Sequence, residues 1–308
     1  MANIRFRRAS LGFITAILFG YFCAASAEAQ TTLRWKFKEG EKLHYSMDQK
    51  MQMKMNIQGM EIEINNTQAT DMTWAVLEVS EDGKHKMTQT IDRIRFKMDN
   101  PMFPVEYDSK EGKEIEGPLG QILGPLFTAM VGAEIELSMN GQGEVSDLKL
   151  PEKLAKVMQS NPALAQMGSM FTEEGLKNMM SQSGAALPKE SVSKGDTWDK
   201  KIEMKMPLIG TMKTSMAFTY LGPDTREGKK FEKIGLKAEL AIEPTPGGMI
   251  QLAIKSQDMK GTIYFDNTAG RMSISLIKQN TVMEVTAGGQ TFEQTIEQTI
   301  TVKLSSGE

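Results

Sequence analysis

Polar and hydrophobic side chains alternate along residues 43–57. Every odd position in this stretch is apolar or amphipathic except Gln49, and every even position is polar. Because the side chains of a β-strand point alternately to its two faces, this period of two predicts a strand with one buried face. After the turn-like sequence NIQG at 56–59, apolar residues move to even positions over 60–64 and 72–76, which predicts an antiparallel hairpin.

The same pattern occurs a second time in the chain. MQMKM at 51–55 is matched by IEMKM at 202–206, and the turn NIQG is matched by PLIG at 207–210. Two further pairs follow in the same order, EDGKHK with REGKKF and YDSKEG with FDNTAG. We interpret these matches as two copies of one β unit, at about 33–117 and 192–306, with a period too long for a solenoid array.

The segment between the two copies has a different pattern. Residues 118–132 are apolar but interrupted by Gly and Pro, and residues 133–150 alternate around a Gly-rich turn, which predicts another hairpin. Pro151 predicts the start of a helix, and Thr172 followed by two glutamates predicts a second start. Because a sheet with one apolar face has to be covered, we expect 118–132 and 152–182 to lie on its inner face.

These patterns predict a mainly β protein. We expect two related antiparallel β units, forming a curved sheet, a half-barrel or a sandwich, with a few short helices inserted between them. The expected organisation is a signal peptide at 1–29, a first β unit at 30–117, a connector at 118–182 and a second β unit at 183–308. We expect the two units and the connector to form one integrated module.

The first 29 residues are typical of an export signal. Three arginines among the first eight residues precede an apolar run at 11–22, which is too short for a comfortable membrane span. Small residues follow, and we expect cleavage after Ala27 or Ala29. The single cysteine, Cys23, does not follow small residues, which favours plain secretion over a lipid anchor. The sequence therefore predicts a bacterial protein that is secreted or periplasmic.

Composition excludes several classes of function for the chain after cleavage. Removing residues 1–29 leaves 33 basic and 38 acidic residues, a net charge of −5, without a long basic run. This balance argues against nucleic acid as a partner. Without a cysteine, the chain has no disulfide, no thiolate catalysis and no Cys-zinc site. A second apolar run of membrane-spanning length is missing, so we expect no transmembrane anchor.

The chain contains 25 methionines, and five of them stand out by their spacing. Met51, Met53 and Met55 share one face of the first expected strand, and Met204 and Met206 repeat this arrangement. Thioether sulfur suits Cu(I), and residues i and i+2 of a strand lie about 6.6 Å apart. Methionine is also a flexible apolar filler of cores and adaptable binding surfaces. The second interpretation is favoured because this face carries no His or Cys.

The sequence shows no constellation of catalytic residues. His44 and His85 stand at polar strand positions or beside a turn, where we expect solvated side chains without catalytic partners. Asp108 and Asp266 stand in matching turns, where Asp accepts a backbone N–H and a following Gly takes a left-handed conformation. We therefore expect a protein that is not an enzyme, with no catalytic residues and no cofactor.

Two stretches resemble a known family. LRWKFKEGEKLHY at 33–45 and ALPKESVSKGDTW at 186–198 are similar to a family of secreted bacterial β-rich proteins, the domain of unknown function 6263. The resemblance implies secretion and a mostly antiparallel β fold, and it implies neither an activity nor catalytic residues. The expected curved sheet with inserted helices also looks like the half-barrels of lipoprotein carriers, which is an analogy of fold alone.

The leading hypothesis is a non-enzymatic binding protein with an apolar cavity lined by Met51, Met53, Met55, Met204 and Met206. The expected partner is a lipid, another apolar small molecule or an apolar segment of a protein. The alternative is a periplasmic Cu(I)-binding protein that uses Met51, Met53 and Met55. The sequence alone does not identify the ligand.

Overall fold

The structure is a computed structural model. It describes residues 30–81, 83–100, 104–112, 115–160, 175–177, 180, 186–206, 209–245, 247–248 and 250–305. The expected signal peptide at 1–29 and the expected helix start at Thr172 lie outside the described residues.

One antiparallel sheet of twelve strands dominates the described chain. Helix α1 (Gly117–Met130) lies between β4 and β5, helix α2 (Glu152–Ser160) follows β6, and the described residues 175–177 and 180 are also helical. The predicted fold class, mainly β with a few short helices, is confirmed. The strands are β1 (Lys42–Ile57), β2 (Met60–Val79), β3 (His85–Asp99), β4 (Val105–Asp108), β5 (Glu134–Met139), β6 (Val145–Lys149), β7 (Thr197–Met206), β8 (Gly210–Arg226), β9 (Lys229–Pro244), β10 (Ile250–Asp266), β11 (Arg271–Ala287) and β12 (Gln290–Ser305).

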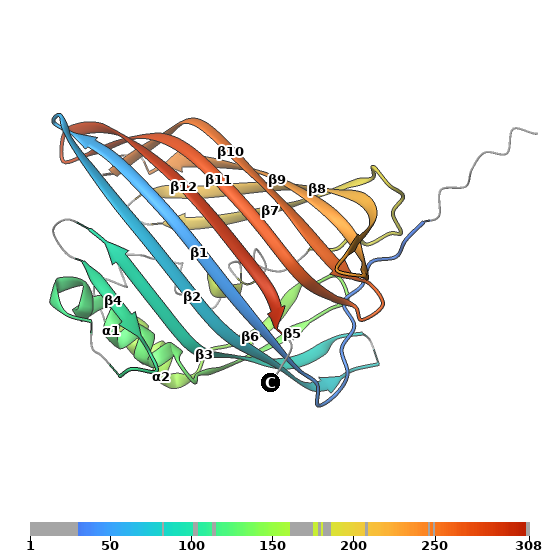
Figure 1. Ribbon diagram of the computed structural model, residues 1–308. Coiled ribbons are helices and arrows are strands. Elements are labelled where there is room, and N and C mark those ends of the chain that lie inside the picture. The colour runs from blue at the N-terminus through green and yellow to red at the C-terminus, as the bar shows by residue number, and fades with distance from the viewer. Residues whose placement is uncertain are drawn as a thin grey trace, which may run out of the picture.

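The order of the strands joins the two sequence copies at the middle of the sheet. From edge to edge the order is β6-β5-β3-β2-β1-β12-β11-β10-β9-β8-β7, and β4 pairs with β3 off this path. β1 and β12 form the junction through thirteen residue pairs in unbroken register. The first three strands of each copy are neighbours in chain order. The sheet is curved and open, with β6 and β7 at its edges (Figure 1).

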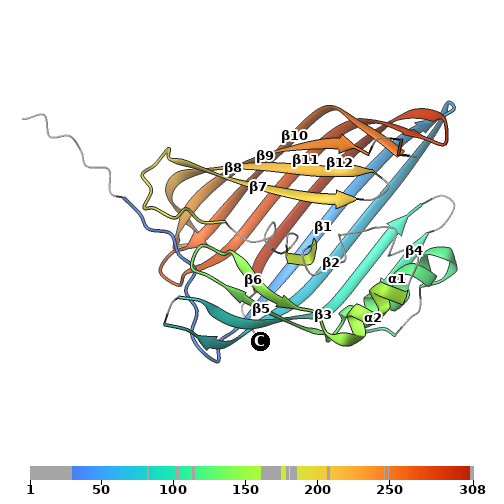
Figure 2. The ribbon, with the colours of Figure 1, turned by 180° about the vertical axis from the view of Figure 1, so that it is seen from behind.

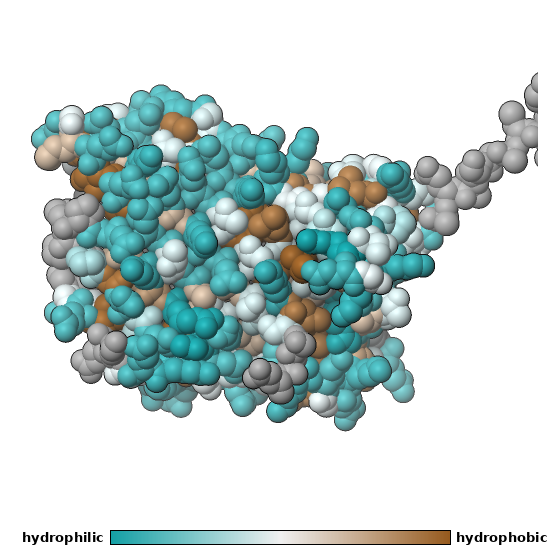
Figure 3. Space-filling view, in the orientation of Figure 1, coloured by the Kyte–Doolittle hydropathy of each residue, from teal (hydrophilic) through white to brown (hydrophobic). Residues whose placement is uncertain are grey.

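The register places the alternating apolar residues of β1 on the concave face. Leu43 and Tyr45 are only 4% and 2% exposed. Neither ladder of β1 contains a register shift, so all odd-numbered residues of β1 lie on the same face as these two. The other, convex face is largely hydrophilic (Figure 3). The strand predicted from the period of two is therefore confirmed.

One buried core connects both halves of the chain. It contains Trp35 and Tyr45 from the N-terminal half, and Ile234 and Phe265 from the C-terminal half. Trp35 packs edge-on against Phe265, with ring centroids 5.5 Å apart. The hydroxyl of Tyr45 donates a hydrogen bond of 3.0 Å to the carbonyl oxygen of Met272. The two β units therefore share one core.

The helices cover the sheet beside β3 and β4 (Figure 2). Leu126 of α1 and Leu154 of α2 belong to the main core, and Phe127 belongs to a smaller cluster with residues of β3 and β4. The expectation that this connector covers the apolar face is confirmed for α1 and α2. α2 begins at Glu152, one residue after Pro151.

Candidate functional site

The three methionines of β1 lie together on the concave face, near the β1–β2 turn. β2 and β12 place isoleucines directly beside them in register. All of these side chains are half-buried, and none belongs to or packs against either buried core cluster. We term this group the methionine face, and it consists of Met51, Met53, Met55, Ile62, Ile64 and Ile296.

A row of uncharged amides separates the methionine face from the main core. These half-buried side chains occupy neighbouring concave positions on β1, β2, β12 and β11. The Oδ1 atom of Asn66, beside Met51, is buried without a hydrogen-bond partner among the described residues. Buried polar atoms are normally paired, so this acceptor lacks the donor that such an atom usually has. We term this row the amide band, and it consists of Gln49, Asn66, Gln68, Gln279 and Gln298.

The methionines of the second copy lie elsewhere in the sheet. Met204 and Met206 are on the edge strand β7, and five strands separate β7 from β1. Met204 is 5% exposed and belongs to the buried residues, directly opposite Met212 of β8. The five methionines singled out by the sequence therefore form two separate groups within the sheet.

Two cavities are lined mainly by residues that the sequence did not single out. One of about 970 Å³ lies between α1, α2 and the turn after β4, and Tyr107, Ile115 and Val157 border it. Another of about 600 Å³ is a largely polar groove across β1, β2 and β10–β12, and Met51 is the methionine that borders it.

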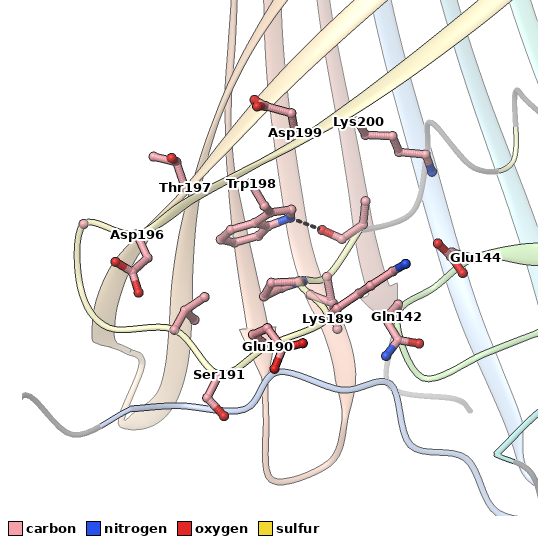
Figure 4. Close-up of a pocket in the computed structure, with 15 residues that line it drawn as sticks. Gln142, Glu144, Lys189, Glu190, Ser191, Asp196, Thr197, Trp198, Asp199 and Lys200 are labelled. Atoms are coloured by element: carbon pink, nitrogen blue, oxygen red, sulfur yellow. Dashed lines mark hydrogen bonds between the residues drawn. The ribbon is translucent and has the colours of Figure 1, made fainter.

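A third cavity, of about 720 Å³, lies between the β5–β6 turn, residues 186–196 and the start of β7 (Figure 4). The indole Nε1 of Trp198 donates a 2.7 Å hydrogen bond to the carbonyl oxygen of Ala186. The backbone N–H of Leu187 donates to the carbonyl of Gln142 at 2.9 Å. The guanidinium of Arg34 donates to the carbonyl of Pro188 at 2.7 Å. Three separate parts of the chain thus fix the wall of this cavity.

The lining of this third cavity is charged. Burial lowers the pKa of Lys200, and the nearby carboxylate of Glu144 acts in the opposite direction. Such a mixed lining does not fit an apolar ligand. The sequence does not predict this cavity, although residues 186–198 carry part of the resemblance to the family. Its ionisable side chains are Glu144, Lys189, Glu190, Asp196, Asp199 and Lys200.

The two histidines have different environments. Nδ1 of His44 lies 2.9 Å from the hydroxyl of Thr73, which donates to Asp92 at 2.7 Å. His85 is only 8% exposed and packs edge-on against Phe37, with ring centroids 5.0 Å apart. The expectation of a solvated surface residue is therefore wrong for His85, because the N-terminal segment covers it. Burial lowers the pKa of His85.

The two aspartates act in turns, as the sequence predicts. Asp108 accepts a 3.0 Å hydrogen bond from the N–H of Lys110, and Asp266 accepts one of 2.9 Å from Ala269. Gly112 and Gly270 have φ of +64° and +66°. Hydrogen bonds from Arg93 and from the Lys110 N–H lower the pKa of Asp108 to about 2. Among the described residues, no group of three His, Cys, Asp or Glu side chains could hold a metal ion.

Comparison with known proteins establishes the family. Residues 82–272, more than half of the 308-residue chain, match the model of the "Family of unknown function (DUF6263)". The chain belongs to this family, which confirms the resemblance seen in the sequence. A search of curated protein sequences found no match.

Several solved structures match the chain at low TM-scores and low identity. Lipovitellin matches 88% of this chain with 9% identity and a TM-score of 0.43, but the match spans only 26% of the lipovitellin chain. An outer membrane channel from Pseudomonas putida F1 matches with 6% identity over 88% of this chain and 97% of its own, at a TM-score of 0.24. DynF from Micromonospora chersina matches with 8% identity over 91% and 88%, at a TM-score of 0.22. Likeness at this level carries no inference about function. Within the described residues, no helix is long and apolar enough to span a membrane.

Proposed function

We propose that this protein is a non-enzymatic, exported binding protein for an amphiphile with a neutral polar head. The apolar chain of the ligand lies on the methionine face, and its head contacts the amide band. The observation that carries this proposal is a set of six apolar side chains on the concave face that remain half-buried outside the core.

The methionine face suits a flexible apolar chain better than a rigid ligand of one fixed shape. Methionine has an unbranched, flexible side chain that adapts to different neighbours. Covering these side chains with a ligand removes apolar surface from water, at about 25 cal/mol per Å². A lipid chain and an apolar segment of a protein would both provide such cover.

The amide band favours a neutral head over a charged one. Its five side chains carry no charge, and the Oδ1 atom of Asn66 has no hydrogen-bond donor among the described residues. A hydroxyl or amide N–H of the ligand would satisfy this acceptor. A monoacylglycerol combines an apolar chain with such hydroxyl donors, and it is therefore a suitable probe.

The test is binding of a pyrene-labelled monoacylglycerol to the delipidated chain 30–308, followed by fluorescence. We expect saturable binding that weakens at least about tenfold, or about 1.4 kcal/mol, in the triple variant Met51→Gln, Met53→Gln, Met55→Gln. The matched control is Lys50→Gln with Lys54→Gln on the convex face of the same strand, which should bind like the wild type. Equal affinity of the triple variant and the wild type would contradict the proposal.

A second triple variant separates this function from Cu(I) binding. Met51→Leu, Met53→Leu, Met55→Leu keeps the surface apolar but removes the sulfur atoms. We expect it to retain binding of the probe. The copper alternative would be favoured if the Gln variant lost Cu(I) uptake but still bound the labelled lipid like the wild type.

A further inference from the structure

β9 and β10 follow each other in the chain, yet they pair only at the end far from their connecting turn. The ladder between them ends at Met259↔Ala238, although both strands continue toward the turn. Residues 240–244 of β9 and 250–256 of β10 are therefore not paired with each other. We term this unpaired region the split.

The neighbouring strands hold both sides of the split in place. β9 stays paired with β8 as far as Pro244, and β10 stays paired with β11 on both sides of a register shift between Ile254 and Ser256. At the inner end of the split, Nε2 of Gln257 donates to the carbonyl of Leu240 at 2.9 Å. The N–H of Leu240 donates to Oε1 of Gln257 at 2.8 Å. The side chain of Gln257 thus makes the two hydrogen bonds to Leu240 that a neighbouring backbone would make. Beyond this point the two strands separate while both remain extended.

In the split, part of the backbone of β10 has donors and acceptors that β9 does not pair with. In an antiparallel ladder, alternate residues direct their N–H and C=O groups to opposite neighbours, so part of 250–256 has no strand partner among the described residues. Leu252 and Ile254 are half-buried on the concave side, whereas Gln251 and Ala253 are exposed on the convex side. The ligand that complements these donors and acceptors is the backbone of an extended peptide.

We propose that the split binds an extended peptide segment of a partner protein as an added strand on β10. The segment is about five residues long, since a strand rises about 3.3 Å per residue, and it carries apolar side chains at alternate positions facing Leu252 and Ile254. β10 provides the pairing edge because the opposite side ends in Pro244, which has no N–H to donate. This site is independent of the amphiphile proposed for the methionine face.

The open edge strand β7 is a natural comparison for the split. It carries Lys200, Lys201 and Lys205, and lysines on an exposed edge hinder the addition of another strand. The unpaired part of β10 carries one lysine, Lys255, whose charge is engaged by Glu284 at 3.0 Å. We therefore expect a peptide to add at the split and not at β7.

The test uses a fluorescein-labelled peptide of alternating valine and threonine flanked by lysines. We expect saturable fluorescence anisotropy, and slower hydrogen exchange of the amides in 250–256 in the complex. The same peptide with N-methyl groups on alternate residues should bind at least tenfold more weakly, because it lacks backbone donors. No binding at about 1 mM peptide, protection at β7 instead of 250–256, or equal affinity of the N-methylated peptide would each overturn the proposal.

A reversible disulfide bond across the split provides the matched control. Ala241→Cys and Ser256→Cys place two cysteines on the convex side, opposite each other where the β9–β10 register would be if it continued three steps beyond Met259↔Ala238. After oxidation to a disulfide the split is closed, and we expect at least a tenfold loss of peptide affinity that reduction restores. Equal affinity of the oxidised and reduced forms would overturn the proposal. If the disulfide does not form, the hydrogen exchange of the wild type decides.

Discussion

A buried histidine shows how one residue can make stability depend on pH. His85 begins β3, is 8% exposed and faces the ring of Phe37. Its Nδ1 atom has no hydrogen-bond partner among the described residues. Burial disfavours the charged imidazolium and lowers the pKa of His85. The unfolded chain therefore binds a proton at a higher pH than the folded chain does.

We predict that this difference makes the free energy of unfolding fall as the pH drops through about 6.5, the ordinary pKa of histidine. Above this pH both states carry a neutral ring, so the full stability is present. In His85→Leu this part of the pH dependence should disappear, and urea unfolding measured between about pH 5 and pH 8 checks it. His44→Gln is the control, and it should retain the decline that His85 causes. An unchanged pH dependence in His85→Leu would count against the role of His85.

At the scale of single residues, the sequence predicts the turns, but it does not predict which distant residue buries a side chain. The turns at Asp108 and Asp266 follow from the preference of Asp and Gly for such positions, and the sequence contains both residues together. The burial of His85 depends on Phe37, nearly fifty residues earlier in the chain. No local pattern around 81–86 reports this contact.

Helix α1 shows how glycines determine the packing of a whole element. A Cβ atom on Gly120 would lie 1.7 Å from the carbonyl oxygen of Ile115, whereas a Cβ atom on Gly124 would have no atom within 4 Å. Ile115 and Phe127 belong to the cluster that α1 forms over β3 and β4. The close approach at Gly120 therefore holds the start of α1 against its preceding segment.

We predict unequal effects for alanine at these two glycines. Gly124→Ala should change the stability little, because the better helix propensity of alanine, up to about 1 kcal/mol, is offset by crowding between its Cβ atom and the ring of Pro125. Gly120→Ala gains the same propensity, but the overlap with Ile115 should reverse the sign and destabilise by about 1–3 kcal/mol. Thermal unfolding of the two variants side by side checks this. Stabilisation by both substitutions would show that α1 does not pack as described.

The elements differ in how far the sequence could predict them. β1, β2 and the hairpin at 133–150 carry a clear period of two and a turn signal, and all three are present. The apolar positions of β10 change from even to odd between Ile254 and Met259, which matches the register shift there, but this change does not predict that β10 separates from β9. Strand pairing is decided by the neighbouring strands and by Gln257, which is information that one strand does not contain.

The whole molecule depends on contacts between its two halves. β12, the last strand, pairs with β1, the first, along thirteen residue pairs. The core likewise combines residues of both β units. The sequence predicted two copies but could not reveal which strands pair between them, because each strand is compatible with several neighbours. The location of the methionine face followed from alternation alone, whereas its separation from Met204 and Met206 required the strand order.

We predict that neither half folds alone. Residues 30–182 lack β12, one of the two partners of β1, and residues 183–308 lack β1, one of the two partners of β12. Each fragment also lacks the core residues that the other contributes. Each fragment should show no cooperative urea transition, and mixing the two should restore one. The intact chain 30–308 is the control. A cooperative transition of either isolated fragment would contradict a single integrated module.

Native mass spectrometry of the chain 30–308, purified gently from a bacterial periplasm, tests the central claim most directly. Binding on the methionine face predicts a bound mass of several hundred daltons that solvent releases and that is identified as an amphiphile with a neutral head. The Gln triple variant should lose this mass, whereas the Leu triple variant should keep it. A folded wild-type protein of bare mass, which also fails to bind the labelled monoacylglycerol, would contradict the account.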